Sequence, residues 1–294
     1  MIAVMGAAGN VGGKLVDLLL AQGQEVRALE HVRRLDALRG RGAEVVTGDA
    51  VNAEDLRPLF RDADAAFVLL PENPADPRFV ANRSRVRRAI AEALGQARVP
   101  YVVALSVAGA DRADLPGPPA GLHEFEQALS RLEDANLLVL RPAAYMDYLL
   151  ANLPLIRSQG VNGSAIDGDR RFPMIATVDV AREAAERLAR RDFAGHQAKL
   201  LLGPEDVSMR QATRAIGARL GLAELPYVTF PPDDVKGALL GAGMSPEAAS
   251  LLVEMQLAVG DGRFFDGLRR TAATATPTRL EEFLAQALEE GARA

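Results

Sequence analysis

Up to about residue 145, the chain alternates between short apolar runs and longer stretches that are apolar on one side only. The opening run MIAVMG is followed by a stretch in which Val11, Leu15, Leu18 and Leu19 recur at helical spacing until Gly23. Further strands are predicted at residues 25–30, 43–49, 64–70, 101–106 and 137–142, and helices at residues 33–40, 53–62, 83–97 and 122–135. This alternation predicts an α/β fold with a doubly wound parallel sheet and helices on both of its faces.

The pattern changes in the second half of the chain. Residues 158–173 are rich in turn formers, after which a helix at 178–191 and a strand at 198–203 are expected to rejoin the main sheet. Beyond Gly203 the pattern is mostly helical, and Ser208 with Gln211 and Thr278 with Glu281 each have the spacing of a capping box. We therefore expect a dinucleotide-binding domain at 1–150 and about 175–203. A smaller, mostly helical substrate-binding lobe is expected at 151–174 and 204–294, packed against the sheet because no low-complexity linker joins them.

Composition narrows the class of protein. A chain of 294 residues is long enough for one large α/β domain with an added lobe, and 49% hydrophobic with 25% charged residues is typical of a chain that folds throughout. The net charge of −5 provides no basic face for nucleic acid. The sequence has no cysteine and only three scattered histidines, so we expect no metal site. It lacks a signal-peptide pattern and an apolar stretch near the roughly 18 residues that span a bilayer, so we expect a cytoplasmic protein that does not contact membranes.

The loop after the first predicted strand carries the chemistry of a phosphate site. Gly6, Gly9 and Gly12 are spaced G-x-x-G-x-x-G between a strand and a helix. Glycines there permit a tight turn and a close approach of backbone to a pyrophosphate, while the helix N-terminus supplies N–H donors. We expect the whole loop, including Ala8, Asn10 and Val11, to bind the cofactor. The alternative is a tight turn without a ligand.

The end of the second predicted strand bears on the choice of cofactor. Glu30 lies about 20 residues after the loop, where an acidic side chain can accept hydrogen bonds from the adenosine ribose. This favours NAD, although His31, Arg33 or Arg34 could instead neutralise the 2′-phosphate of NADP. Alternatively, Glu30 is only a solvated charge at the end of a strand.

Several segments together resemble one family. GAAGNVG, EVVTGD, VVALSVAGAD, VLRPAAYMDYLL, FPMIATVDVA and TPTRLEEF are similar to the corresponding motifs of the NmrA-like atypical short-chain dehydrogenase/reductases, which have an NAD(P)-binding Rossmann fold. The resemblance covers nearly the whole chain. It departs from the family at His31, where an arginine is common, and at Asp147 and Tyr148, where the family often has Glu-Asn.

The resemblance implies further cofactor and substrate contacts. It implies that Asp49 and Ala50 border the adenine, that Leu69, Leu70 and Pro71 lie near the ribose, and that Pro142, Ala144 and Tyr145 approach the nicotinamide. We add Leu105, at the end of the fifth predicted strand, to the expected cofactor contacts. A substrate cleft is implied between the sheet and the C-terminal lobe, which agrees with the rule that open α/β sheets bind ligands beyond the carboxyl ends of their strands.

The usual catalytic pair of short-chain reductases is missing. These enzymes use Tyr-x-x-x-Lys, in which the lysine lowers the tyrosine pKa. No tyrosine has a lysine four positions later: Leu105 follows Tyr101, Leu149 follows Tyr145, Asn152 follows Tyr148 and Pro231 follows Tyr227. The corresponding helix instead reads GLHEFEQ, similar to the family's GLHxxEQ version. His123 and Glu126 share a helical face, so Glu126 could orient the imidazole, and we expect His123 with Ser106 to position a substrate. The alternative is that His123 only packs or caps the start of its helix.

Hydride transfer to a cationic or electron-poor acceptor does not require a protein acid. Met146, Tyr148, Phe172 and Met174, together with Tyr145, are expected to form a flat apolar substrate pocket, with ordinary core packing as the alternative. The sequence thus predicts an NAD(P)H-dependent reductase of a conjugated or aromatic small molecule such as a quinone, a dye or a carbonyl compound. The alternative is a non-catalytic redox sensor that acts through a protein partner, and a weaker one is an isomerase or dehydratase. The oligomeric state is open, with a homodimer as one option.

Overall fold

The computed structural model describes residues 1–30 and 35–293 of the chain. Within these ranges, seven parallel strands form one sheet in the order β10-β6-β5-β4-β1-β2-β3. The strands are β1 (Ile2–Val4), β2 (Val26–Glu30), β3 (Glu44–Thr47), β4 (Ala65–Leu69), β5 (Tyr101–Leu105), β6 (Asn136–Pro142) and β10 (His196–Leu201). The predicted parallel sheet is confirmed, including the return of the strand after residue 195. The strand order reverses between β1 and β4, which is the switch point where open α/β sheets bind ligands.

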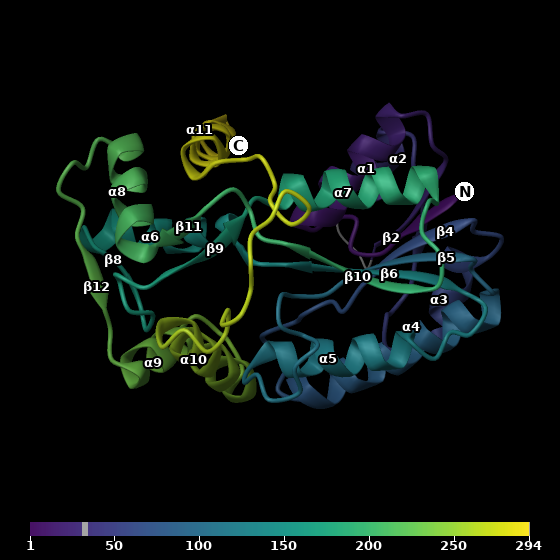
Figure 1. The fold of residues 1–294 in the computed structure, drawn as a ribbon, viewed down its shortest axis with the longest axis horizontal. Coiled ribbons are helices and arrows are strands. Elements are labelled where there is room, and N and C mark those ends of the chain that lie inside the picture. Colours follow the sequence, from purple (N-terminus) through teal and green to yellow (C-terminus); the bar gives the residue numbers. More distant parts are fainter. Residues whose placement is uncertain (31–34, 294) are drawn as a thin grey trace.

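Helices cover both faces of this sheet (Figure 1). One face carries α1 (Asn10–Ala21), α2 (Leu35–Gly40) and α7 (Thr177–Arg190), and the other carries α3 (Ala53–Phe60), α4 (Phe79–Ala97) and α5 (Pro118–Leu129). Because both faces are covered, the central strands are apolar along their length: β4 reads AAFVL, and all but its last residue are buried. Leu15 of α1 packs in the core on the first face, and Ile90 of α4 packs in the core on the second.

The rest of the chain adds small sheets and further helices. The short strands are β7 (Ala144–Tyr145), β8 (Asn162–Ser164), β9 (Arg171–Ile175), β11 (Asp206–Ser208) and β12 (Tyr227–Thr229). The helices are the 3-10 helix η1 (Met146–Asn152), α6 (Leu153–Gln159), α8 (Met209–Leu220), α9 (Pro232–Gly241), α10 (Pro246–Gly260) and α11 (Leu280–Arg293). β9 pairs with β7 in parallel and with β11 antiparallel, and β8 pairs with β12. The sequence pattern did not predict these strands, which are two to five residues long and, unlike those of the main sheet, are not set in a regular alternation with helices.

The two predicted capping boxes have different outcomes. Ser208 caps α8 as expected, with its hydroxyl accepting from the Gln211 N–H and the Gln211 side chain accepting from the Ser208 N–H. At the start of α11, Thr278 donates both its N–H and its hydroxyl to Asp179 of α7. Because the Thr278 N–H is bonded to Asp179, Glu281 does not complete the predicted box.

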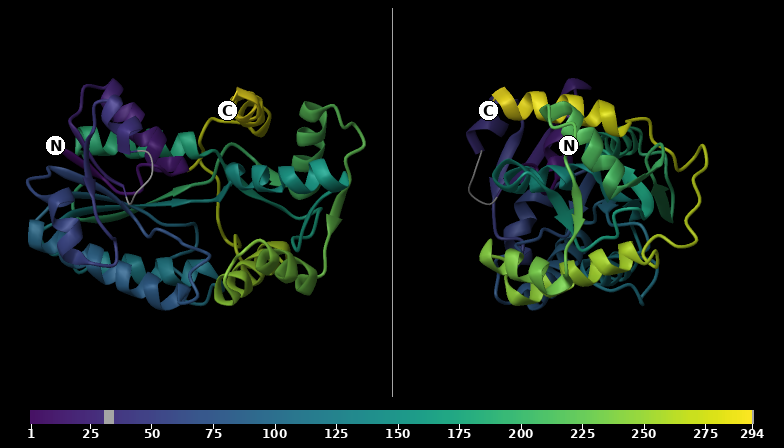
Figure 2. Two further views of the ribbon diagram at one scale, coloured as in Figure 1. Left: turned by 180° about the vertical axis from the view of Figure 1, so that it is seen from behind. Right: turned by 90° about the vertical axis from the view of Figure 1, so that its left-hand side faces the viewer.

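The C-terminal segment ties the added elements to the main sheet. Residues 261–279 run from α10 on one side of the molecule to α11 on the other (Figure 2). On the way, the Leu202 N–H donates to the Thr274 carbonyl at 2.8 Å, directly after β10. A third apolar core, which includes Met146, Phe264 and Leu284, lies beneath this segment and α11. The added elements are thus packed against the sheet, while the expected domain boundaries stay a prediction.

Candidate cofactor and substrate site

The glycine loop has a backbone that side chains would disrupt. Gly6 has φ +67°, and a Cβ there would lie 2.7 Å from the Leu69 Cδ2. A Cβ on Gly12 would lie 2.1 Å from the Gly6 carbonyl oxygen, so α1 can pack against the loop only if residue 12 is glycine. At Gly9 the nearest atom to a Cβ would be the same oxygen, at 3.2 Å.

The first turn of α1 fits an anionic group. Gly9 is the N-cap residue, α1 has no side-chain cap, and its first turn contains no acidic residue. Ala8, Gly9 and Asn10 are exposed, whereas Val11 and Gly12 are buried under the loop. The Gly9 N–H donates to the Gly6 carbonyl at 2.9 Å. The N–H groups of Asn10, Val11 and Gly12 belong to the first turn of the helix, which has no intrahelical acceptor for them, so they can bind a pyrophosphate, and the positive end of the helix dipole favours it. The residues present fit a dinucleotide here.

The other expected cofactor contacts lie along the carboxyl edge of the sheet. They lie at or just after the ends of β3 (Asp49, Ala50), β4 (Leu69, Leu70, Pro71), β5 (Leu105) and β6 (Pro142, and Ala144 and Tyr145 of β7). Asp49 accepts a hydrogen bond from the Val51 N–H at 3.1 Å and is exposed. The side chain of Glu30 and the whole of His31 lie outside the described residues, so the choice between NAD and NADP stays a prediction.

Ser106 is held by a buried ion pair. Its hydroxyl donates to the Glu126 carboxylate at 2.5 Å, and the Arg141 guanidinium binds the same carboxylate through two hydrogen bonds, of 3.1 and 2.5 Å. Ser106 and Glu126 are only 5% and 8% exposed. A buried carboxylate needs such partners to offset its lost hydration.

The expected contact between Glu126 and His123 was therefore wrong. The His123 Nδ1 instead lies 2.7 Å from the carbonyl oxygen of Ala110. Since a carbonyl only accepts, Nδ1 carries the proton, and Nε2 makes no hydrogen bond to any residue that the structure describes. Arg141, which sequence reasoning missed, outcompeted the imidazole because it brings a full charge and two donors. The sequence feature that could have pointed to Arg141 is its position as a single cation near the end of the apolar run LLVLRP.

Tyrosines follow the end of β6. The rings of Tyr145 and Tyr148 lie 5.8 Å apart with a 51° tilt, and Tyr148 is 64% exposed. Burial, with smaller contributions from Tyr148 and Asp147, raises the pKa of the Tyr145 phenol. A phenol with a raised pKa holds its proton tightly and is a weak acid catalyst.

Asp147 connects this region to α1 and α7. Its carboxylate accepts from the Thr177 hydroxyl at 2.8 Å and from the Thr177 N–H at 3.3 Å. The Lys14 ammonium lies 3.9 Å from the same carboxylate, one turn after the glycine loop. This link fixes the Tyr145 to Tyr148 segment beside the start of α1.

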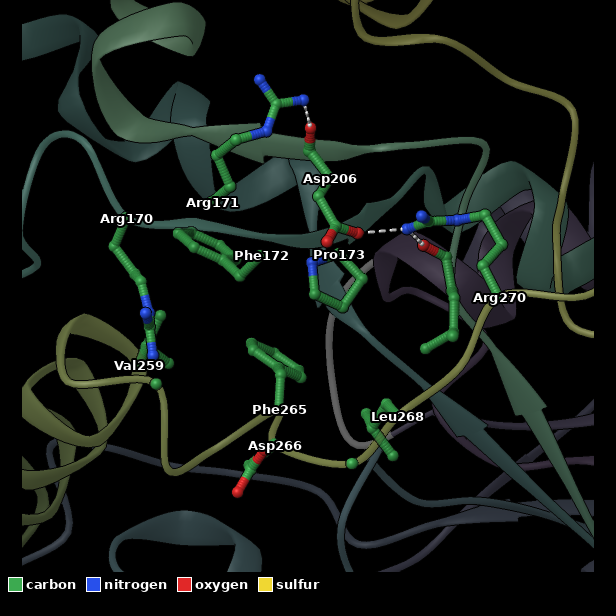
Figure 3. A pocket seen from close by; sticks show the side chains of 13 residues that line it. Arg170, Arg171, Phe172, Pro173, Asp206, Val259, Phe265, Asp266, Leu268 and Arg270 are labelled. Carbon is green, nitrogen blue, oxygen red and sulfur yellow. Dashed lines mark hydrogen bonds and ion pairs between the residues drawn. The ribbon is translucent and has the colours of Figure 1, made fainter.

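The expected substrate residues divide into two groups. Met146 and Met174 are 0% and 3% exposed and pack in the third apolar core. For these two residues the structure therefore agrees with the alternative, ordinary core packing. Phe172 is also buried but lines a pocket of about 300 Å³, and Tyr148 is exposed. Figure 3 shows this pocket between the start of β9 and the segment that follows α10. Of the residues described by the structure, no group of three or more His, Asp or Glu is arranged to hold a metal ion.

The Rossmann-like fold and the glycine loop define an NAD(P)-binding protein. In agreement with this, the profile of the NAD(P)H-binding family matches residues 6–155. The chain belongs to this family. No helix in the described part of the chain is long and apolar enough to cross a membrane.

Two curated proteins are similar in sequence. Festuclavine dehydrogenase easG of Aspergillus fumigatus is 32% identical over 143 residues, which cover 46% of this chain and about half (47%) of that enzyme. The uncharacterized oxidoreductase YesF of Bacillus subtilis is 26% identical over 97% of this chain and 94% of its own length.

Solved structures share the whole fold. The NADPH complex of the quinone oxidoreductase QOR2 of Escherichia coli has a TM-score of 0.82 at 21% identity, over 98% of this chain and 100% of that one. The NADP(H) complex of triphenylmethane reductase from a Citrobacter species has a TM-score of 0.81 at 19% identity, with the same coverage. NmrA, a negative transcriptional regulator solved with NADP, has a TM-score of 0.68 at 17% identity, over 98% of this chain and 90% of NmrA. The expected NmrA-like Rossmann fold is confirmed.

Proposed function

We propose that this protein is an NAD(P)H-dependent reductase of a conjugated or aromatic small molecule, such as a quinone, a dye or a conjugated carbonyl compound. The observation that carries the proposal is that none of the three candidate proton donors is free to release a proton to a substrate. The Ser106 hydroxyl donates to Glu126, the Tyr145 phenol has a raised pKa, and the His123 Nδ1 proton is bonded to Ala110. An acceptor that needs no proton from the protein during hydride transfer suits such a site.

In this reaction, the residues of the chain bind the cofactor and orient its reacting ring. The glycine loop and the first turn of α1 hold the pyrophosphate, and the ends of β4, β5 and β6 fix the position of the reacting ring. A bound reduced dinucleotide supplies a hydride, which is two electrons and one proton. A quinone that accepts the hydride becomes a hydroquinone anion, and water supplies the second proton. His123 remains a predicted proton donor only in its doubly protonated form, in which Nε2 also carries a proton.

The activities named for three relatives support this proposal. QOR2 is a quinone oxidoreductase, the Citrobacter enzyme is a triphenylmethane reductase, and festuclavine dehydrogenase is also an oxidoreductase by name. NmrA, a negative transcriptional regulator that binds NADP, is consistent with the alternative, in which this protein does not catalyse a reaction but acts as a redox sensor through a protein partner.

The first test is a titration of the purified protein with NAD, NADH, NADP and NADPH by calorimetry. A panel of quinones and dyes follows, with cofactor oxidation monitored by absorbance near 340 nm. We expect binding of both redox forms and oxidation that depends on the protein and on the acceptor. We expect His123→Ala to keep most of this turnover. Tight cofactor binding without turnover of any acceptor would contradict the reductase and support the sensor.

A further inference from the structure

The pocket in Figure 3 is a candidate ligand site that is separate from the glycine loop. Its volume is about 300 Å³, near the lower end for small-molecule sites. It is lined by the start of β9, by Leu202 and Asp206 around the β10–β11 connection, and by residues between Val259 and Arg270. None of the expected cofactor contacts lines it, whereas Phe172, an expected substrate residue, does.

The walls of the pocket are bonded to the strand end that is expected to meet the nicotinamide. In β9, Met174 pairs with Ala144, two residues after the pocket residue Phe172. On the other side, the Ala143 N–H donates to the Leu201 carbonyl at 2.8 Å, next to the pocket residue Leu202. The strands that border the pocket are therefore bonded on both sides to the Ala143 to Tyr145 segment.

The pocket contains a fixed aromatic surface. The Phe172 and Phe265 rings are stacked with centroids 5.8 Å apart and 6° between their planes, and Phe264 meets Phe265 edge-on at 4.7 Å. Phe172 and Phe264 are 3% and 2% exposed, while Phe265 is only partly buried. The two buried rings hold Phe265 in place, and Figure 3 shows it at the pocket wall. Phe172 occupies one face of the Phe265 ring, and the part of the ring that is still exposed suits contact with a planar ligand.

The pocket also carries an excess of positive charge. Three arginines and two aspartates line it, and the Arg270 guanidinium is paired with the Asp206 carboxylate. Arg171 donates to the Gln211 side chain and to the Asp206 carbonyl, and neither Arg171 nor Arg170 forms a close ion pair with a carboxylate among the described residues, although the charge of Arg170 contributes to the lowered pKa of Asp261. The remaining acid, Asp266, does not offset both of these charges.

Arg170 is the guanidinium that is best placed to take a ligand. Arg170 is an exposed residue, and the only side-chain hydrogen bond it makes within the described chain is to the Asp261 carbonyl, at 2.9 Å, so its other donors are open to solvent or to a ligand. Gly262 has φ +89°, and a Cβ there would lie 1.1 Å from an Arg170 nitrogen, so the guanidinium lies flush against this glycine. The absent side chain at position 262 thus makes room for Arg170 at the pocket.

We propose that this pocket is the acceptor site of the proposed reductase and that the acceptor is a planar aromatic molecule with an acidic group. The ring stacks on Phe265, and Arg170 binds the carboxylate or sulfonate, which matches the two-pronged geometry of a guanidinium. This inference rests on the proposed function and narrows it: the pocket favours anionic quinones over cationic dyes.

The test compares two naphthoquinones in the full-length protein with saturating reduced cofactor. 1,4-Naphthoquinone-2-sulfonate carries the acidic group, and 2-methyl-1,4-naphthoquinone is its neutral counterpart. For Arg170→Gln we expect KM for the sulfonate to rise about tenfold and KM for the neutral quinone to change less than about twofold, because only the charge-assisted hydrogen bonds are lost. Arg157→Gln, an exposed arginine on α6 away from the pocket, is the matched control and should change neither value. Equal effects of Arg170→Gln on both quinones, or none on either, would overturn the proposal.

A binding measurement separates this inference from the proposed function. 2-Naphthalenesulfonate cannot be reduced by the cofactor, and its binding is measured by calorimetry in the wild type, Arg170→Gln, Arg157→Gln and Phe265→Leu. If no quinone is turned over, the reductase proposal fails. Binding that is lost in Arg170→Gln and Phe265→Leu but kept in Arg157→Gln still supports the pocket as an anionic aromatic site. No binding to the wild type overturns it, and circular dichroism confirms that each variant is folded.

Discussion

At the scale of single residues, the glycine loop is specified by contacts between backbone atoms. Gly12 is the most constrained of the three, since a Cβ there would meet the Gly6 carbonyl oxygen at 2.1 Å. The next residue, Gly13, is in the same helical turn, but a Cβ there would lie 3.4 Å from the nearest atom, the Ala7 carbonyl oxygen. The two adjacent glycines thus have different roles. Gly12 allows α1 to pack closely against the glycine loop, whereas this packing does not require a glycine at position 13.

This difference gives a matched pair of variants. Gly12→Ala should displace the loop from α1, lower the free energy of unfolding by about 1–3 kcal/mol, and weaken NAD(P)H binding by at least about tenfold. Gly13→Ala should keep the affinity, and the added helix propensity is worth up to about 1 kcal/mol of stability. Calorimetric titration and urea unfolding measure the two effects. Equal cofactor affinity in the two variants would show that cofactor binding does not depend on the Gly6–Gly12 contact.

At the scale of elements, α7 is fastened to the edge strand β10 by a carboxylate. Glu183 accepts from the Lys199 ammonium of β10 at 2.7 Å and from the Arg187 Nε at 2.8 Å. Burial of Glu183 opposes its ionisation, but the hydrogen bonds and charges of Lys199 and Arg187 outweigh it and hold the pKa below its ordinary value of 4.5. The ionised carboxylate is therefore more favourable in the folded than in the unfolded protein.

The stabilisation by Glu183 should depend on pH. Because the folded-state pKa is lowered, this stabilisation is fully present above pH 4.5 and is lost as the pH falls through the lower folded-state value. Glu183→Gln should lower the free energy of unfolding by about 1 kcal/mol at pH 7, and the difference from the wild type should shrink below pH 4.5. Urea unfolding at pH 7, 5 and 4 measures it.

Glu186→Gln on the same helix is the control for this experiment. Glu186 pairs with Arg190, and both side chains are well exposed, at 42% and 64%. Such a pair contributes little, so the change should stay below about 0.5 kcal/mol at every pH. A Glu183→Gln effect of the same size at pH 7 and pH 4 would contradict the assigned role of the carboxylate.

At the scale of the whole molecule, one buried carboxylate joins distant parts of the chain. Asp179 of α7 is 3% exposed and accepts from the Thr278 hydroxyl at 2.7 Å and the Thr278 N–H at 2.9 Å, across 99 residues of sequence. Arg182 adds an ion pair at 2.9 Å from an exposed position. Asp179 therefore fixes the position at which α11 begins. It also holds the C-terminal end of the 261–279 segment, part of which lines the pocket.

Asp179→Ala should loosen this end of the molecule. The Thr278 N–H and hydroxyl would be left buried without partners, so we expect a loss of about 2–3 kcal/mol in the free energy of unfolding. Hydrogen exchange in α11 and protease cleavage within residues 269–279 should both become faster. Arg182→Ala removes the exposed partner of the same carboxylate and should cost less than about 1 kcal/mol. Unchanged exchange in α11 would show that its apolar contacts alone are sufficient to hold it.

The sequence by itself determined the parallel sheet, its helices and the glycine loop. These features depend on local information: each strand and helix shows its own periodicity, and the fingerprint glycines lie within seven residues of one another. For the same reason the Ser208–Gln211 capping box was predictable, because both partners belong to one helical turn.

Only the tertiary structure decided the side-chain partners and the pocket. Glu126 lies on the same helical face as His123, yet it pairs with Arg141 of the neighbouring strand, because a buried carboxylate gains most from a cation that provides two hydrogen bonds. Thr278 has the spacing to cap α11 with Glu281, but Asp179 takes its N–H. The pocket brings together Arg170 and Phe265, which are 95 residues apart in the sequence, and no local pattern encodes such an encounter. Periodicity specifies which face of an element is buried, whereas the packing of those faces determines which polar groups meet.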